Sequence, residues 1–107
     1  MHVNNIKANK YMNSEISCLA EIHVSEGRTN PKDIHKRVSK LLEESGELAQ
    51  AINKDMSVEL IKKELGDVIN TCIAVAETYQ FTLNECVCMV VDDLNKRKKM
   101  ECKNESK

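Results

Sequence analysis

Two short acidic motifs stand some twenty residues apart in this chain, and their residue types could do chemistry together. ESGEL occupies residues 44–48 and ELGDV occupies residues 64–68, so each motif reads acid, any residue, glycine, acid, aliphatic. Both motifs lie in stretches that otherwise favour a helix, where a glycine costs about 0.5–1 kcal/mol relative to alanine. Carboxylates three residues apart on a helix also repel each other. These costs are offset if the helices hold the two acid pairs in register.

A helical wheel places both acid pairs on the same flank of their helices. At about 100° per residue, Glu44 falls at about 280° and Glu47 at about 220°, beside an apolar stripe centred near 15°. On the following helix Glu64 falls at about 300° and Asp67 at about 240°, beside a stripe centred near 20°. The four acids therefore border the expected core on one seam and do not lie opposite it.

Small side chains and glycines flank these acids. The seam continues through Thr71, Ala74 and Thr78, which leaves a groove beside the carboxylates. Gly46 and Gly66 fall on the other flank, at about 120–140°, where the absence of a Cβ lets another helix approach closely. The sequence therefore predicts a groove on one side of the acids and a tight helix contact on the other.

Four carboxylates that converge across a helix pair repel each other strongly unless a cation lies among them. The motifs contain no His or Cys, and oxygen-only ligation favours a hard cation, Mg²⁺ or Mn²⁺, over zinc. The ExxH motif of di-iron bundles and the GxxxxGK[ST] phosphate loop are both absent from the sequence. Metal-dependent hydrolysis of a phosphoryl or pyrophosphoryl group is the chemistry indicated. The competing interpretation is a solvated helix edge with lysine partners.

The rest of the chain predicts four helices in a single all-α domain covering residues 1–107. The first spans about residues 13–27 and stops at Gly27, Asn30 caps the second, and Ser57 caps the third. Thr82 and Glu85 fit a capping box at the start of the fourth helix, which runs into KRKK before a tail expected to fray. Short links between the last three helices favour antiparallel neighbours and hence a compact bundle.

Composition bounds the class of protein. The 107 residues include one Phe, two Tyr and no Trp, so the core has few large side chains and a homo-oligomer is expected. A formal charge of −1 gives no general attraction to nucleic acid or to an anionic membrane. No apolar run approaches the roughly 20 residues of a membrane span, and no signal-peptide segment is seen, so a cytoplasmic location is expected. The five cysteines form no CxxC pair and are expected to be reduced.

The segments KLLEESGELAQAI and IKKELGDVINTCIAVAETYQFTLNECV resemble the MazG-like nucleotide pyrophosphohydrolases, the all-α NTP pyrophosphatase superfamily. The family pattern is EExxE, a variable spacer and ExxD, which here is Glu43-Glu44 to Glu47, sixteen residues, then Glu64 to Asp67. The resemblance covers about residues 30–100. It implies Mg²⁺-dependent hydrolysis of a nucleoside triphosphate to a monophosphate and pyrophosphate. The metal ligands implied are Glu44, Glu47, Glu64 and Asp67.

Further site residues follow from the same resemblance. Glu43 matches the first acid of the motif and could orient a water, hold a lysine or face solvent; Glu43 and Glu47 are the candidate catalytic residues. The fourth helix of the family ends in an Asn followed by basic residues that approach the phosphates, which implies Asn95 and Lys98 as substrate-binding residues. Asn70, one turn after the ExxD motif, is a candidate for contact with the base or sugar.

Several functions stay open at this level. The enzyme could clear non-standard nucleotides from the pool or act on one nucleotide, and it could assemble as a homodimer or a homotetramer. Phosphoribosyl-ATP pyrophosphohydrolase shares the acid motifs and is the nearest enzymatic alternative. A helical protein that binds nucleotide or a partner without turnover is the alternative of a different class. His23 and His35 are expected to be ordinary helix residues, since nothing in the sequence pairs them with the acids.

Overall fold

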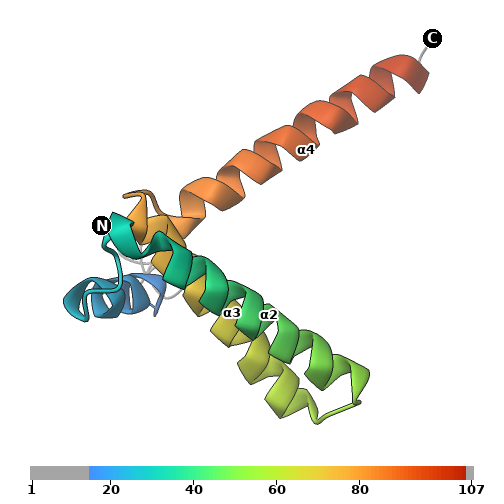
Figure 1. The fold of residues 1–107 in the computed structure, drawn as a ribbon. Helices are drawn as coiled ribbons and strands as arrows, with labels where there is room; N and C mark the ends of the chain where they lie inside the picture. Colours follow the sequence, from blue (N-terminus) through green and yellow to red (C-terminus); the bar gives the residue numbers. More distant parts are fainter. Residues whose placement is uncertain (1–14, 106–107) are drawn as a thin grey trace, which may run out of the picture.

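The computed structural model describes residues 15–105 of the chain, and α-helices dominate this range (Figure 1). An N-terminal helix covers residues 15–25 of the described part, and its predicted start at residue 13 lies outside it. The 3-10 helix η1 spans Pro31–Asp33, α2 spans Ile34–Asn53, α3 spans Val58–Thr78 and α4 spans Leu83–Glu105. No strand occurs in residues 15–105, so the all-α prediction is confirmed. None of the helices described is long and apolar enough to cross a membrane.

The N-terminal helix stops in the turn that contains Gly27, as predicted. Gly27 adopts φ +73°, its N–H donates to the Val24 carbonyl at 3.1 Å, and the Arg28 N–H donates to the His23 carbonyl at 2.9 Å. This pair of bonds is a Schellman motif, which satisfies the last carbonyls of a helix and favours glycine at the left-handed position. The motif places His23 and Arg28 together at the end of the helix.

The predicted cap Asn30 accepts from the Lys32 N–H at 3.0 Å at the start of η1, whereas α2, which follows directly, has Asp33 at its N-cap without a side-chain hydrogen bond. The starts of α3 and α4 are set by local hydrogen bonds. The Ser57 Oγ accepts from the Leu60 N–H at 3.2 Å at the start of α3. Thr82 and Glu85 form the predicted capping box of α4: the Glu85 N–H donates to Thr82 Oγ1 at 3.1 Å, and the Thr82 N–H donates to Glu85 Oε2 at 2.6 Å. The α4 helix then continues as far as Glu105, into the segment that was expected to fray.

The helices α2 and α3 form an antiparallel pair, and α4 leads away from it (Figure 1). Val87, Val90 and Leu94 of α4 are 53%, 58% and 53% exposed, so the described part of the chain leaves this helix largely uncovered. The radius of gyration is 17.6 Å, against about 13 Å for a compact chain of this length. The described part of one chain therefore does not close the compact bundle that the short links predicted, because no helix within residues 15–105 folds back along α4.

The buried residues of α3 are not those of the predicted aliphatic stripe: Ile73 and Ala76 are each 2% exposed, and the seam of small residues is buried with them. Thr71, Ala74 and Thr78 are buried, whereas Leu65 on the predicted stripe is 48% exposed and Val38 on α2 is 43% exposed. The N-terminal helix lies against this part of α3, which explains the shift. Both threonine hydroxyls donate to backbone carbonyls four residues earlier, at 3.0 Å and 2.7 Å, so they are buried without losing their hydrogen bonds.

The expected close helix contact at the two glycines does not occur within the described chain. A Cβ built at Gly46 or at Gly66 has no atom within 4 Å. The flank is open because, among the described helices, α2 pairs with α3, and these two helices contact each other elsewhere on their surfaces. No described segment of the chain approaches these glycines closely.

Candidate metal centre and its cavity

The acids of the two motifs gather around Glu44. Oxygens of Glu44, Glu64 and Asp67 lie within 4.8 Å of one another, and so do oxygens of Glu43, Glu44 and Glu47. Glu44 belongs to both groups, so it joins the acids of α2 to those of α3. The helical periodicity that put each pair on one flank and the antiparallel packing of α2 on α3 together produce this convergence.

Two carboxylate oxygens in this cluster are buried without a hydrogen-bond partner. Glu44 is 7% exposed, and its Oε2 is buried without any hydrogen bond in the described part of the chain. Glu64 Oε2 is in the same state. A buried charged oxygen without a partner is costly, and native structures rarely retain one unless an ion or water completes it. Both atoms are therefore suited to a cation.

The cluster is only partly neutralised by lysines. Lys40 Nζ lies 3.1 Å from Glu44 Oε1 and 3.5 Å from Glu43 Oε1, and Lys63 Nζ lies 2.8 Å from Asp67 Oδ2. The pKa of Lys40 is raised by its hydrogen bond to Glu44 and by the charges of both glutamates. Of the three roles considered for Glu43, the structure shows two together, contact with a lysine and exposure to solvent, since 57% of its side chain is accessible.

The raised pKa of Glu47 shows that repulsion among the carboxylates remains. The negative charge of Glu44 is the main cause that raises the pKa of the Glu47 carboxyl, followed by desolvation and by the charge of Glu64. Like charges that share a site favour protonation of one of them. A cation bound among the acids would remove this repulsion.

The donor set fits a hard divalent ion. Both groups contain carboxylate oxygens alone, without His or Cys. Opposite oxygens around Mg²⁺ are about 4.2 Å apart, since each lies about 2.1 Å from the ion. The oxygens of each group lie within 4.8 Å of one another, which is compatible with ligation of one ion. The residues that would hold the ion are Glu44, Glu64 and Asp67, with Glu47 adjoining them.

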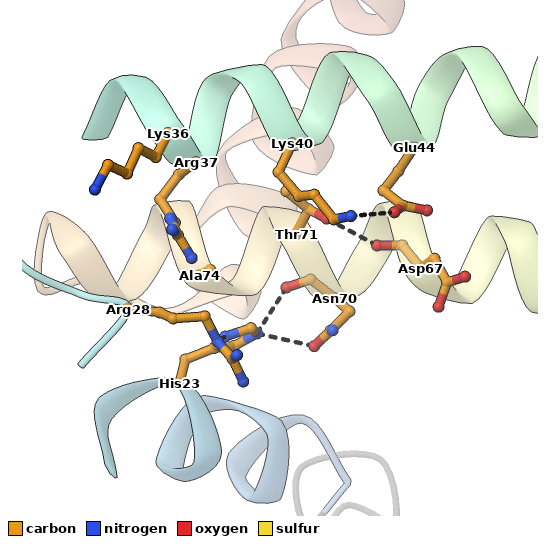
Figure 2. A pocket seen from close by; sticks show the side chains of 10 residues that line it. All are labelled: His23, Arg28, Lys36, Arg37, Lys40, Glu44, Asp67, Asn70, Thr71 and Ala74. Atoms are coloured by element: carbon orange, nitrogen blue, oxygen red, sulfur yellow. Dashed lines mark hydrogen bonds and ion pairs between the residues drawn. The ribbon is translucent and has the colours of Figure 1, made fainter. Parts of the chain in front are cut away.

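A cationic cavity opens beside the acids, in the groove that the small residues predicted (Figure 2). It has a volume of about 460 Å³, and Glu44 and Asp67 form one part of its wall, next to Thr71 and Ala74. Basic side chains from α2 and from the segment before it line the rest. They are Arg28, Lys36, Arg37 and Lys40.

The sequence patterns did not predict that these basic residues line the cavity. Lys36, Arg37 and Lys40 lie within one turn of each other on the Glu44 side of α2, so extending the wheel beyond the acids could have found them. Arg37 extends from α2 toward the cavity, and its Nε is buried without a partner among the described residues (Figure 2). Arg28 precedes α2 in a turn, and no periodicity could have assigned it to the cavity.

His23 is not the ordinary helix residue that was expected. It is 5% exposed, and it connects the N-terminal helix to α3 through Asn70, 47 residues away in the chain. Its Nε2 lies 2.9 Å from Asn70 Oδ1, and its Nδ1 lies 3.0 Å from Arg28 Nε. The expectation failed because only tertiary packing brings these segments together. Asn70 itself lines the cavity, one turn beyond Asp67.

The structure does not bring Asn95 and Lys98 to the acids of the same chain. Both lie on α4, which leads away from the α2–α3 pair (Figure 1). A second, smaller cavity of about 370 Å³ does adjoin the acids, on the Glu47 and Glu64 side. It is lined in addition by Gln50, Ala51, Lys54, Met56 and Leu60.

The fold is all-helical, with a carboxylate cluster between two antiparallel helices and a cationic cavity beside it. These features define a class of protein that is suited to binding metal-bound phosphates. Comparison with known protein families agrees with this class: the family model for the MazG nucleotide pyrophosphohydrolase domain matches residues 32–101. The chain belongs to this family. No match was found among curated proteins or among solved structures.

Proposed function

We propose that this protein is a Mg²⁺-dependent nucleoside triphosphate pyrophosphohydrolase, which converts a nucleoside triphosphate and water into a monophosphate and pyrophosphate. The observation that carries the proposal is the pair of buried, unpartnered oxygens on Glu44 and Glu64, in an oxygen-only cluster next to a cationic cavity. Cleavage between the α- and β-phosphates rests on membership of the MazG family.

The chain's own residues suit this reaction. A divalent cation at the cluster would neutralise phosphate oxygens and activate a water molecule for attack. The cationic side chains of the cavity bind the phosphate chain, and the buried Arg37 Nε is free to donate to a phosphate oxygen. Attack of the water oxygen on the α-phosphorus breaks its bond to the bridging oxygen, and the bonding electron pair leaves with pyrophosphate. Glu47, whose pKa is raised mainly by the charge of Glu44, accepts the proton of the water.

The protein further acts as a homo-oligomer in this proposal, either a dimer or a tetramer. Val38, Leu42, Leu65 and Ile69 are 43%, 69%, 48% and 42% exposed, and they lie on α2 and α3 along the flank that also holds the two open glycines. A helix from a second copy could pack closely there, and burial of these side chains at about 25 cal/mol per Å² would stabilise the pair. Asn95 and Lys98 could then serve the site of a neighbouring copy.

One experiment tests the reaction. The purified protein is incubated with Mg²⁺ or Mn²⁺ and a panel of common and modified nucleoside triphosphates together with phosphoribosyl-ATP, and the products are separated. Monophosphate plus pyrophosphate is the expected result. Diphosphate plus orthophosphate contradicts it, and turnover of phosphoribosyl-ATP alone assigns the enzyme to that substrate. No turnover with either metal would indicate a nucleotide-binding protein without activity.

A further inference from the structure

A chain of hydrogen bonds crosses from the N-terminal segment to α3 at the wall of the cationic cavity (Figure 2). Arg28 Nε donates to His23 Nδ1 at 3.0 Å. His23 Nε2 lies 2.9 Å from Asn70 Oδ1 and 3.1 Å from the Asn70 backbone oxygen. His23 is buried at 5% exposure, and Arg28 is held in turn by an ion pair with Glu26.

The hydrogen-bond partners of His23 allow only one tautomer of its imidazole ring. A guanidinium Nε–H can only donate, so His23 Nδ1 must be an acceptor. A backbone carbonyl can only accept, so His23 Nε2 must carry a hydrogen. The imidazole is therefore the Nε2–H tautomer, and this is decided by two groups whose own roles are unambiguous.

The orientation of the Asn70 amide follows from this tautomer. The side-chain atom next to the Nε2–H must be the carbonyl oxygen, because the alternative would set two donors against each other. The Asn70 NH₂ group is then the free end of the amide. No residue in the described part of the chain accepts a hydrogen bond from it, and Asn70 lines the cavity one turn beyond Asp67. Asn70 thus presents a fixed donor next to the candidate metal centre.

We propose that Asn70 recognises an acceptor oxygen of the bound nucleotide, and that His23, held by Arg28, is the positioning residue that keeps the Asn70 NH₂ turned toward the ligand. The identity of the ligand rests on the proposed function. The orientation of the amide does not. A carboxamide without such a restraint can rotate by half a turn and present its oxygen, which an acceptor oxygen would reject.

Ring ¹⁵N chemical shifts of the full-length, ligand-free protein test the positioning step without any turnover. The expected spectrum has His23 Nε2 protonated and Nδ1 unprotonated. An Nδ1–H tautomer, or fast exchange between the two, would overturn the proposal. The variant Arg28→Gln is expected to keep Nε2 protonated, because the Asn70 backbone carbonyl still accepts from it, and the exposed His35 keeps the same shifts in both proteins.

Ligand binding tests whether His23 acts through Asn70. The probes are α,β-methylene analogues of the four common nucleoside triphosphates, with Mg²⁺, measured by calorimetry. His23→Asn keeps an acceptor for Arg28 but cannot reach Asn70, and it should weaken binding of the best analogue about five- to tenfold, the effect of one hydrogen bond. His23→Gln places a donor near the position of Nε2 and should stay within about twofold of the wild type. His35→Asn is the matched control and should change nothing.

A double-mutant cycle separates positioning from a general effect on the fold. On an Asn70→Ala background, His23→Asn should cost less than about twofold more, since both changes remove the same interaction. The proposal is overturned if the two losses multiply, or if His23→Gln weakens binding as much as His23→Asn. Thermal unfolding of each variant shows whether a loss of binding reflects a loss of folded protein. If it does, the ¹⁵N spectrum of the wild type decides whether His23 positions Asn70.

Inorganic tripolyphosphate identifies the source of the acceptor oxygen. An equal loss of tripolyphosphate binding in His23→Asn supports recognition of a phosphate oxygen. A loss confined to the nucleotide analogues supports recognition of a sugar or base oxygen. If the wild type binds neither probe, Asn70 is not a recognition residue. Failure of the proposed function is a different result, namely binding of the probes with no hydrolysis of the parent nucleotides.

Discussion

Glu44 on α2 and Asp67 on α3 face each other across the helix pair, with carboxylate oxygens within 4.8 Å, and each is held by a lysine four residues earlier on its own helix. Lys40 contacts Glu44 at 3.1 Å and Lys63 contacts Asp67 at 2.8 Å. These lysines reduce the repulsion between the acids while no metal is bound. A divalent cation must compete with both of them, and it would release Lys40 toward the cavity that this side chain already lines.

Glu44→Gln should abolish most activity without harming the fold. The change removes the carboxylate shared by both acid groups, so a loss of about 100-fold or more in kcat is expected from the lost metal contact. It also removes a buried charge whose Oε2 has no partner in the described chain, so Tm should stay the same or rise. Activity and thermal unfolding are measured together. The control is Glu59→Gln, since Glu59 is an exposed acid of α3 whose side chain is 85% accessible. Equal losses of activity in both variants would show that Glu44 is not part of the active site.

Mg²⁺ should stabilise the folded protein, because it binds acids that converge only after folding. At a free Mg²⁺ concentration about 100 times Kd the gain is about 2.7 kcal/mol, or roughly 10–20 °C in Tm for a domain of this size. Calorimetry with and without EDTA measures the shift. Asp67→Asn should remove most of the shift and most of the activity, and Glu47→Gln most of the activity, while both variants retain the helical circular dichroism. Collapse of the helical signal in these variants would mean that the acids are structural.

Leu42→Lys should weaken self-association. Leu42 is 69% exposed on the flank that carries the open glycines, and a lysine there would be buried without a partner if a second copy covers it. Sedimentation is expected to show a shift toward monomer at unchanged helical content. Val24→Lys, at a residue of the N-terminal helix that is 55% exposed, is the matched control. A wild-type protein that sediments as a monomer at all concentrations would contradict the oligomer.

Cys72 should be alkylated more slowly than the exposed cysteines. Burial is the main cause that raises the pKa of the Cys72 thiol, which lowers its share of reactive thiolate at pH 8. Cys18 and Cys88 are exposed to the reagent, whereas Cys72 is only partly accessible. Iodoacetamide labelling of the native protein, followed by mass spectrometry, gives the order of modification. Urea should remove the difference, since the denatured chain exposes all thiols equally. Labelling of Cys72 as early as Cys18 or Cys88 in the native protein would contradict its protection by burial.

The local parts of this molecule follow from sequence alone. The period of 3.6 residues put Glu44 with Glu47, and Glu64 with Asp67, on one flank of each helix, and the Gly27 stop and the Thr82–Glu85 capping box need only neighbours in the chain. These features depend on hydrogen bonds over a few residues, which the residue types decide by themselves.

The long-range parts were decided by packing. Burial of Glu44 as the acid common to both clusters depends on how α2 lies on α3, and contact of His23 with Asn70 joins residues 47 positions apart. The direction of α4, which carries Asn95 away from the acids of its own chain, is set by the turn after α3 (Figure 1). No periodicity encodes these arrangements, because each results from the free energy of contacts between segments whose sequences are unrelated.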